Sequence, residues 1–229
     1  MATPTPRLYF AYGSNLSPTQ MALRCPSSVP VGLAYLPDYT FTINSRRYAN
    51  VVRNVAPPLA TPTSGTHAVP ASGGNDNSSS NGGGQTDPAN PGVYGVLYIL
   101  PPADEAVLDR CEGVPYAYQK EDLLVTVVSV TGPNGCDGDD DDDDSIARPR
   151  NGATVAALVY VDNDRVEPST PWDEYVDRMN RGVDEATRLF GLPAGYVDRV
   201  IRPYIPASEE ASVADHTAIG DPFLERALM

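Results

Sequence analysis

The chain has 229 residues, a formal net charge of −14 and a single lysine. Scattered arginines without a basic patch argue against nucleic-acid binding. Its three cysteines are widely spaced, which gives neither a disulfide framework nor the ligand spacing of a zinc site, and no apolar run reaches the length of a membrane span. We therefore expect a soluble cytoplasmic protein with no metal site, no cofactor and no nucleic-acid or membrane partner.

The N-terminal part of the sequence predicts strands and one short helix. Residues 8–12 form an apolar strand that ends in turn-forming residues, and residues 16–26 read as a helix that Pro26 ends. Two further runs, 32–44 and 49–56, are rich in β-branched and aromatic residues, which favour strands.

The central and C-terminal parts continue the mixture of strands and helices. The apolar run 93–100 predicts a strand buried on both faces, and a helix follows it with Pro at its start and Gly113 just past its end. About six strands and three or four helices indicate an α+β domain, a small barrel-like mixed β-sheet with packed helices. The remaining elements are strands at 123–130 and 153–161, an amphipathic helix ended by Gly191-Leu192-Pro193, and a second short helix.

One domain, residues 7–205, accounts for these elements, and residues 206–229 form a C-terminal tail. Two low-complexity segments, 57–92 and 132–150, interrupt the domain, and their compositions predict disordered insertions. The second contains seven aspartates and reads as a solvated, self-repelling loop, with weak divalent-ion binding as the alternative.

Few residues are available for catalysis. His67 lies in the first insertion and His216 in the tail, so neither suits a Ser-His-Asp or Cys-His group, which needs a histidine on a rigid element. Lys120 is followed by two carboxylates and is a poor Schiff-base lysine. Carboxylates, tyrosines and backbone amides remain.

The segment YFAYGSNLSP ends a strand in Gly13, Ser14 and Asn15. Backbone N–H groups exposed at such a place suit an anion, although an ordinary strand-to-turn junction explains the same residues. Glu112 is the most informative carboxylate, because it falls in the last turn of a helix, where the macrodipole disfavours an anion by about 0.3–1 kcal/mol. A raised proton affinity would suit general acid–base catalysis, and the alternative is an exposed glutamate on a frayed helix end.

Three segments together resemble the γ-glutamylcyclotransferases: YFAYGSNLSPTQMALRCP, VYGVLYILPPADEAVLDRCEGV and PSTPWDEYVDRMNRGVDEATRLFGLPAGYV. They occur in the order typical of that family and cover most of the chain outside the insertions. The resemblance implies a small barrel-like domain that converts a γ-glutamyl compound into 5-oxoproline and a free amine without a cofactor.

The resemblance also implies roles for particular residues. The loop from Tyr12 to Leu16 would hold the substrate α-carboxylate through backbone amides. Glu112 would be the acid/base, taking a proton from the substrate ammonium and returning it to the leaving nitrogen. The implied substrate-binding residues are Tyr9, Phe10, Ala11, Tyr12, Gly13, Ser14, Asn15, Leu16, Tyr118, Tyr160 and Tyr175.

The leaving group stays open at this stage. A γ-glutamyl amino acid, glutathione or a conjugate of it, and a γ-glutamyl amine all fit the implied reaction. The oligomeric state also stays open, and a homodimer is one possibility. A non-catalytic module that binds a small γ-glutamyl molecule is the alternative from another class of protein.

Overall fold

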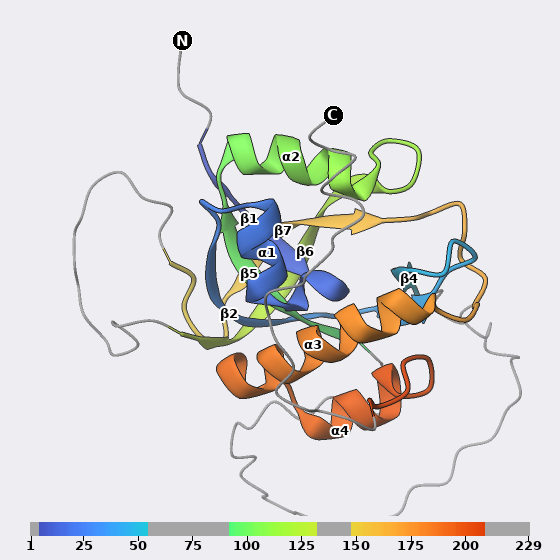
Figure 1. Ribbon diagram of the computed structural model, residues 1–229. Helices are drawn as coiled ribbons and strands as arrows, with labels where there is room; N and C mark the ends of the chain where they lie inside the picture. The colour runs from blue at the N-terminus through green and yellow to red at the C-terminus, as the bar shows by residue number, and fades with distance from the viewer. Residues whose placement is uncertain (1–4, 55–91, 132–147, 209–229) are drawn as a thin grey trace, which may run out of the picture.

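The structure is a computed structural model that describes residues 5–54, 92–131 and 148–208 (Figure 1). Nearly all of the two predicted insertions and of the predicted tail lies outside the described residues, and so do His67, Cys136 and His216.

Five strands close into a barrel, and this confirms the predicted fold class (Figure 1). The barrel closes because β1 pairs antiparallel with β5 on one side and parallel with β7, through Tyr9 and Leu158, on the other. Nearly every residue of β5 is buried, as the apolar run predicted. In the order of the barrel the strands are β1 (Arg7–Ala11), β5 (Val93–Leu100), β2 (Val29–Leu36), β6 (Gln119–Val130) and β7 (Thr154–Val161).

A separate hairpin, β3 (Tyr39–Ile43) with β4 (Ala49–Arg53), extends from the barrel. The sequence run 32–44 thus spans parts of two strands, which belong to different sheets. The chain turns between them at Asp38, whose φ of 62° lies in the left-handed region that Asp tolerates better than most residues. The hairpin matters for function because its turn reaches the candidate site.

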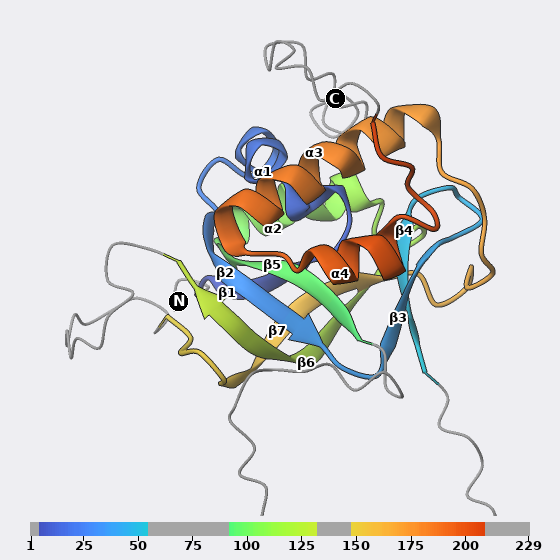
Figure 2. The same ribbon diagram turned by 90° about the horizontal axis from the view of Figure 1, so that it is seen from below.

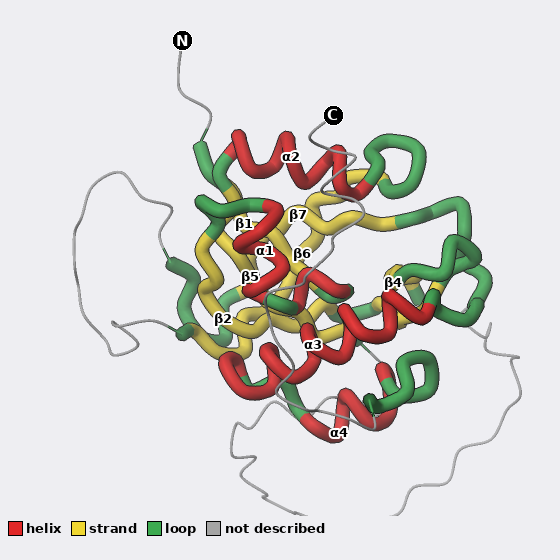
Figure 3. Tube along the Cα trace, viewed as in Figure 1, coloured by secondary structure: helices red, strands yellow, loops and turns green. Residues whose placement is uncertain are grey.

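The helices gather on one side of the barrel (Figure 2). In Figure 3, α1 lies between α2 and α3. This arrangement brings helices from both halves of the chain to the end of β1. The helices are α1 (Pro18–Arg24), α2 (Pro102–Glu112), α3 (Asp173–Phe190) and α4 (Ala194–Tyr196), which continues into η2 (Val197–Ile201).

Two glycines end the longer helices as predicted. Gly113 follows α2 with a φ of 67°, and Gly191 follows α3 with a φ of 75°. These left-handed conformations are accessible to glycine without the steric cost that a Cβ imposes. Along α3 the buried residues recur every three or four positions, so that one face packs on the barrel and the loop after β1.

Candidate active site

The loop between β1 and α1 forms one wall of an open pocket of about 530 Å³, including its mouth. The loop contains a single turn of 3₁₀ helix, η1 (Ser14–Leu16). Within it the Leu16 amide donates to the Gly13 carbonyl at 2.9 Å and the Ser17 amide donates to the Ser14 carbonyl at 3.2 Å. The turn therefore uses the Leu16 amide, which the sequence had assigned to the ligand, and leaves the amides of Gly13 and Asn15 as candidate donors.

The start of α1 is fixed to α3 by a buried carboxylate. Glu185 accepts a hydrogen bond from the Ser17 hydroxyl at 2.8 Å and another from the Thr19 amide at 3.1 Å. Burial of a carboxylate is costly unless donors satisfy it, and here the first turn of α1 provides them. The loop before α1 is consequently held at both ends, by β1 and by α3.

Asn15 connects the loop to the other walls of the pocket. Its Nδ2 donates to the Tyr9 hydroxyl at 2.9 Å and to Oε1 of Glu112 at 3.0 Å. Its Oδ1 accepts from Gln20 at 2.8 Å and from Arg24 at 3.2 Å. Four neighbours thereby fix the orientation of one side-chain amide, and this preorganises the carboxylate beside it.

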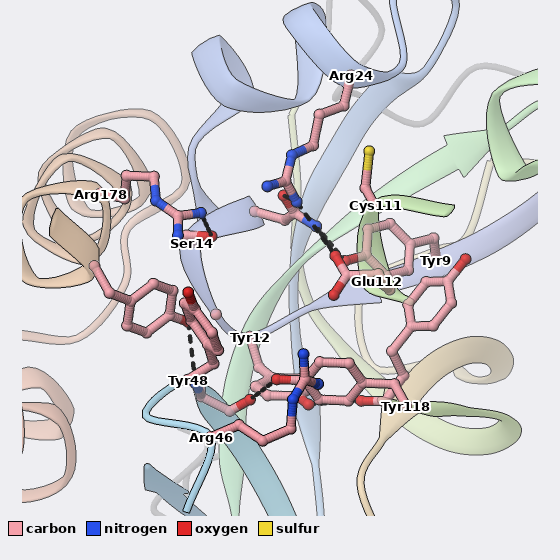
Figure 4. A pocket seen from close by; sticks show the side chains of 15 residues that line it. Tyr9, Tyr12, Ser14, Arg24, Arg46, Tyr48, Cys111, Glu112, Tyr118 and Arg178 are labelled. Carbon is pink, nitrogen blue, oxygen red and sulfur yellow. Dashed lines mark hydrogen bonds and ion pairs between the residues drawn. The ribbon is translucent and has the colours of Figure 1, made fainter. Parts of the chain in front are cut away.

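Glu112 is the last residue of α2, and its carboxylate lines the pocket (Figure 4). Nη1 of Arg24 lies 3.3 Å from Oε1, and the Arg24 side chain is only 3% exposed while that of Glu112 is 17% exposed. The carboxylate therefore does not belong to a frayed, exposed helix end. Arg24 and Asn15 both favour the ionised carboxylate and so oppose the unfavourable field at the helix C-terminus.

Buried tyrosines make up much of the remaining lining. Burial raises the pKa of Tyr9, Tyr12, Tyr118 and Tyr160 well above the ordinary value, so their hydroxyls stay protonated near neutral pH. Three of these hydroxyl protons are used within the protein. Tyr12 donates to the Tyr160 carbonyl at 2.6 Å, Tyr118 donates to the Ala49 carbonyl at 2.7 Å, and Tyr160 donates to Oδ1 of Asp109 at 2.7 Å.

The hydroxyl of Tyr175, on α3, accepts hydrogen bonds from the backbone. The Ala49 amide donates to it at 3.2 Å, and the Ser14 backbone forms a second hydrogen bond with it. Burial is the largest influence on this group and raises the pKa of Tyr175 to about 12. A neutral hydroxyl that accepts from two amides keeps its own proton for another acceptor, such as a ligand oxygen.

The turn of the β3–β4 hairpin supplies a third wall, with Arg46, Tyr48 and Ala49. Ala49 bonds to Tyr118 through its carbonyl and to Tyr175 through its amide, which joins the hairpin to both α3 and the segment after α2. The site thus combines four segments that are distant in sequence: the β1–α1 loop, the hairpin, the end of α2 and the start of α3.

Most of the sequence-predicted residues meet at this pocket, but three do not. Phe10, Ala11 and Leu16 are at most 1% exposed, and their side chains pack in the core. Neighbouring residues of a strand point to opposite faces, so Phe10 packs against Gly95 while Tyr9 faces the pocket. The predicted residues that line the pocket are Tyr9, Tyr12, Gly13, Ser14, Asn15, Glu112, Tyr118, Tyr160 and Tyr175.

Sequence reasoning did not find the arginines of the site, which were described only as scattered. Arg178 follows Tyr175 by three positions on α3, and this helical spacing places both on one face. Arg24 and Arg46 carried no comparable signal, because the fold alone brings them to the pocket. The other lining residues that were missed are Tyr48, Ala49 and Cys111.

No group of three His, Cys, Asp or Glu side chains with the arrangement of a metal site occurs in the described part of the chain. Within those same residues, no helix has both the length and the apolar character needed to cross a membrane.

Comparison with known proteins gives matches in structure but not in sequence. No protein-family model and no curated protein matches the sequence. Among solved structures, an uncharacterized protein from Homo sapiens aligns with a TM-score of 0.56 at 17% identity, over 99% of this chain and 100% of the other.

Two further solved structures give similar values. A structure named gamma-glutamyl cyclotransferase aligns with a TM-score of 0.55 at 17% identity, over 97% of this chain and 98% of the other. YkqA from Bacillus subtilis aligns with a TM-score of 0.54 at 16% identity, over 90% of this chain and 57% of the other. The chain therefore has the γ-glutamylcyclotransferase-like fold, as the resemblance predicted, and at these identities the matches show the fold alone.

Proposed function

We propose that the chain is a γ-glutamylcyclotransferase, which cyclises the γ-glutamyl group of its substrate to 5-oxoproline and releases an amine or amino acid. The observation that carries the proposal is the carboxylate of Glu112, ordered by Asn15 and Arg24 at the edge of a tyrosine-lined pocket. The fold and the resemblance support the same reaction.

In the proposed reaction Glu112 acts as base and then as acid. Its carboxylate takes one proton from the substrate α-ammonium, and the freed amine attacks the γ-carbonyl carbon. The new C–N bond closes a five-membered ring, and the bond to the leaving nitrogen breaks as Glu112 returns its proton to that nitrogen. The second proton that the attacking nitrogen must lose to become the lactam N–H passes through the same carboxylate to the released amine, which leaves as an ammonium. Because nucleophile and electrophile belong to one molecule, holding the substrate in a folded conformation supplies much of the rate.

The loop wall suits the α-carboxylate of the substrate. In this proposal the amides of Gly13 and Asn15 and the hydroxyl proton of Tyr175 donate to the carboxylate, beside Arg178, whose Nη1 contacts the Ser14 hydroxyl at 3.4 Å. Arg178 also pairs with Glu174 at 2.8 Å, which fixes its guanidinium beside the loop. An anion held here would place the neighbouring ammonium inside the pocket, where Glu112 is the lining carboxylate.

The direct test is 5-oxoproline release from γ-glutamyl dipeptides, glutathione and γ-glutamyl amines. In Glu112→Gln the side chain keeps its shape but cannot accept a proton, so kcat should fall by about 10²–10⁴-fold, the usual contribution of general acid–base catalysis. Glu167→Gln is the matched control, because Glu167 is exposed and lies outside the pocket. Its kcat should equal that of the wild type.

Two results would contradict the proposal. Glu112→Gln with unchanged kcat and an unchanged melting temperature would remove Glu112 from the mechanism. A wild-type protein that binds γ-glutamyl compounds in calorimetry but releases no 5-oxoproline from any of them would instead be a binding module with this fold.

A further inference from the structure

Arg46 is the pocket cation whose charge the described residues do not neutralise. Arg24 pairs with Glu112, and Arg178 pairs with Glu174. Nη1 of Arg46 is buried and has no hydrogen-bond partner in the described part of the structure, and its guanidinium forms no ion pair there. A buried charged donor without an acceptor is costly, which indicates that a bound ligand provides the acceptor.

The position of Arg46 is set by its surroundings. Its amide donates to Oδ1 of Asn44 at 3.0 Å, and its carbonyl accepts from the Trp172 indole at 3.2 Å. The guanidinium lies over two aromatic rings, 5.5 Å from the ring centre of Tyr118 and 5.9 Å from that of Tyr48. The backbone and the side chain are therefore both held, so that the buried donor is a preorganised feature of the pocket.

Arg46 enters the pocket from a different wall than the loop. In Figure 4, Ser14 and Arg178 lie on one side, Glu112 lies on another, and Arg46 points inward from the hairpin below them. In the proposed function the loop wall binds the α-carboxylate of the γ-glutamyl group, and Gly13, Ser14 and Asn15 of this loop line the pocket. An anion bound by Arg46 would then belong to another part of the substrate.

We infer that Arg46 binds a carboxylate on the leaving group and makes this site selective for γ-glutamyl amino acids over γ-glutamyl amines. The inference rests on the proposed function. A γ-glutamyl amino acid carries two carboxylates and one ammonium, and a γ-glutamyl amine lacks the second carboxylate. The unneutralised guanidinium matches that second carboxylate in charge, and its planar donors suit a carboxylate in geometry.

Two substrates that differ by a single group test the inference: γ-glutamylalanine and γ-glutamylethylamine, which lacks only the alanine carboxylate. Wild-type kcat/KM should be higher for γ-glutamylalanine. Arg46→Met keeps the length and apolar contacts of the side chain but removes its charge. We expect it to lower kcat/KM for γ-glutamylalanine by about 10- to 100-fold and to change that for γ-glutamylethylamine by less than about twofold.

Arg47→Met is the matched control on the same turn. Arg47 lies outside the pocket, with its guanidinium 3.9 Å from the ring centre of Trp172 and hydrogen bonds to the Thr170 and Pro171 carbonyls. It should leave the ratio of the two kcat/KM values unchanged. Arg46→Lys retains the charge without the planar donors, so that its ratio should fall between those of wild type and Arg46→Met.

The outcomes separate this inference from the proposed function. Equal losses on both substrates would assign Arg46 to the γ-glutamyl end and overturn the inference while the cyclotransferase activity stands. No loss on either substrate would overturn it as well. If wild type releases no 5-oxoproline, the proposed function fails. The inference is then tested by calorimetric Kd values, and it stands if Arg46→Met weakens binding of γ-glutamylalanine but not of γ-glutamylethylamine.

Discussion

Gly13 shows how one residue affects the site without touching the chemistry. Its φ of −100° lies outside the left-handed region that favours glycine. Space is the reason for glycine here, because a Cβ would lie 3.0 Å from the Tyr175 hydroxyl and 3.2 Å from the Ala49 Cβ. Glycine lets α3 and the hairpin approach the loop closely.

Gly13→Ala should therefore act through Tyr175. The added methyl group displaces the hydroxyl from the Ala49 amide, and the loss of one such hydrogen bond should reduce kcat/KM by about 2- to 15-fold. The melting temperature should change little, because alanine at this position does not have to adopt a left-handed φ. In a Tyr175→Phe background, Gly13→Ala should cost less than it does alone; additive losses would show that the two residues act independently.

At the scale of secondary structure, the end of a helix determines where a site residue lies. Gly113 ends α2 directly after Glu112, and a Cβ there would meet the Ala117 Cβ at 2.9 Å. Gly191 ends α3 in nearly the same conformation, but a Cβ there has nothing within 4 Å. An alanine at Gly191 would therefore impose only the strain of a left-handed backbone. An alanine at Gly113 would impose that strain and also a steric clash beside Glu112.

Both glycine-to-alanine changes should lower the free energy of unfolding by about 1–2 kcal/mol, the cost of a Cβ in the left-handed conformation. Only Gly113→Ala should also lower kcat, because its clash moves the chain beside Glu112. Chemical denaturation and 5-oxoproline release, measured on both variants, check the comparison. Equal kcat values for the two would mean that the end of α2 does not control the position of Glu112.

At the scale of the whole molecule, the barrel and the helices packed on it bury several tyrosines. Burial is the largest cause of a raised pKa at Tyr9, Tyr12, Tyr98, Tyr118 and Tyr175. Unfolding returns these groups to their ordinary value of 10.0. Above that pH the unfolded chain loses protons that the folded chain retains. The contribution of these tyrosines to the free energy of unfolding is therefore fully present below pH 10 and declines as pH rises.

Thermal melts from neutral pH upward should show this decline. The melting temperature should begin to fall near pH 10 and continue to fall towards the pKa of Tyr175, which is about 12. Ultraviolet absorbance of phenolate should rise in step with unfolding as measured by circular dichroism. A large phenolate signal from a chain that is still folded would contradict the burial of these hydroxyls.

Local sequence determined the elements and several members of the site. Alternating and continuous apolar runs predicted β1 and β5, and a terminal proline and glycine predicted the limits of α2. The Gly-Ser-Asn turn and the position of Glu112 at a helix end pointed to two walls of the pocket. These features are local, because propensity, capping and periodicity depend on neighbouring residues.

Only the tertiary structure decided which polar and charged groups meet. Arg24 reaches Glu112 across 88 positions of sequence, and the Ala49 amide reaches Tyr175 across 126. The same packing removed Phe10, Ala11 and Leu16 from the pocket and brought Arg46 into it. No local pattern encodes such pairs, since they depend on barrel closure and on the placement of the β3–β4 hairpin, which long-range contacts determine.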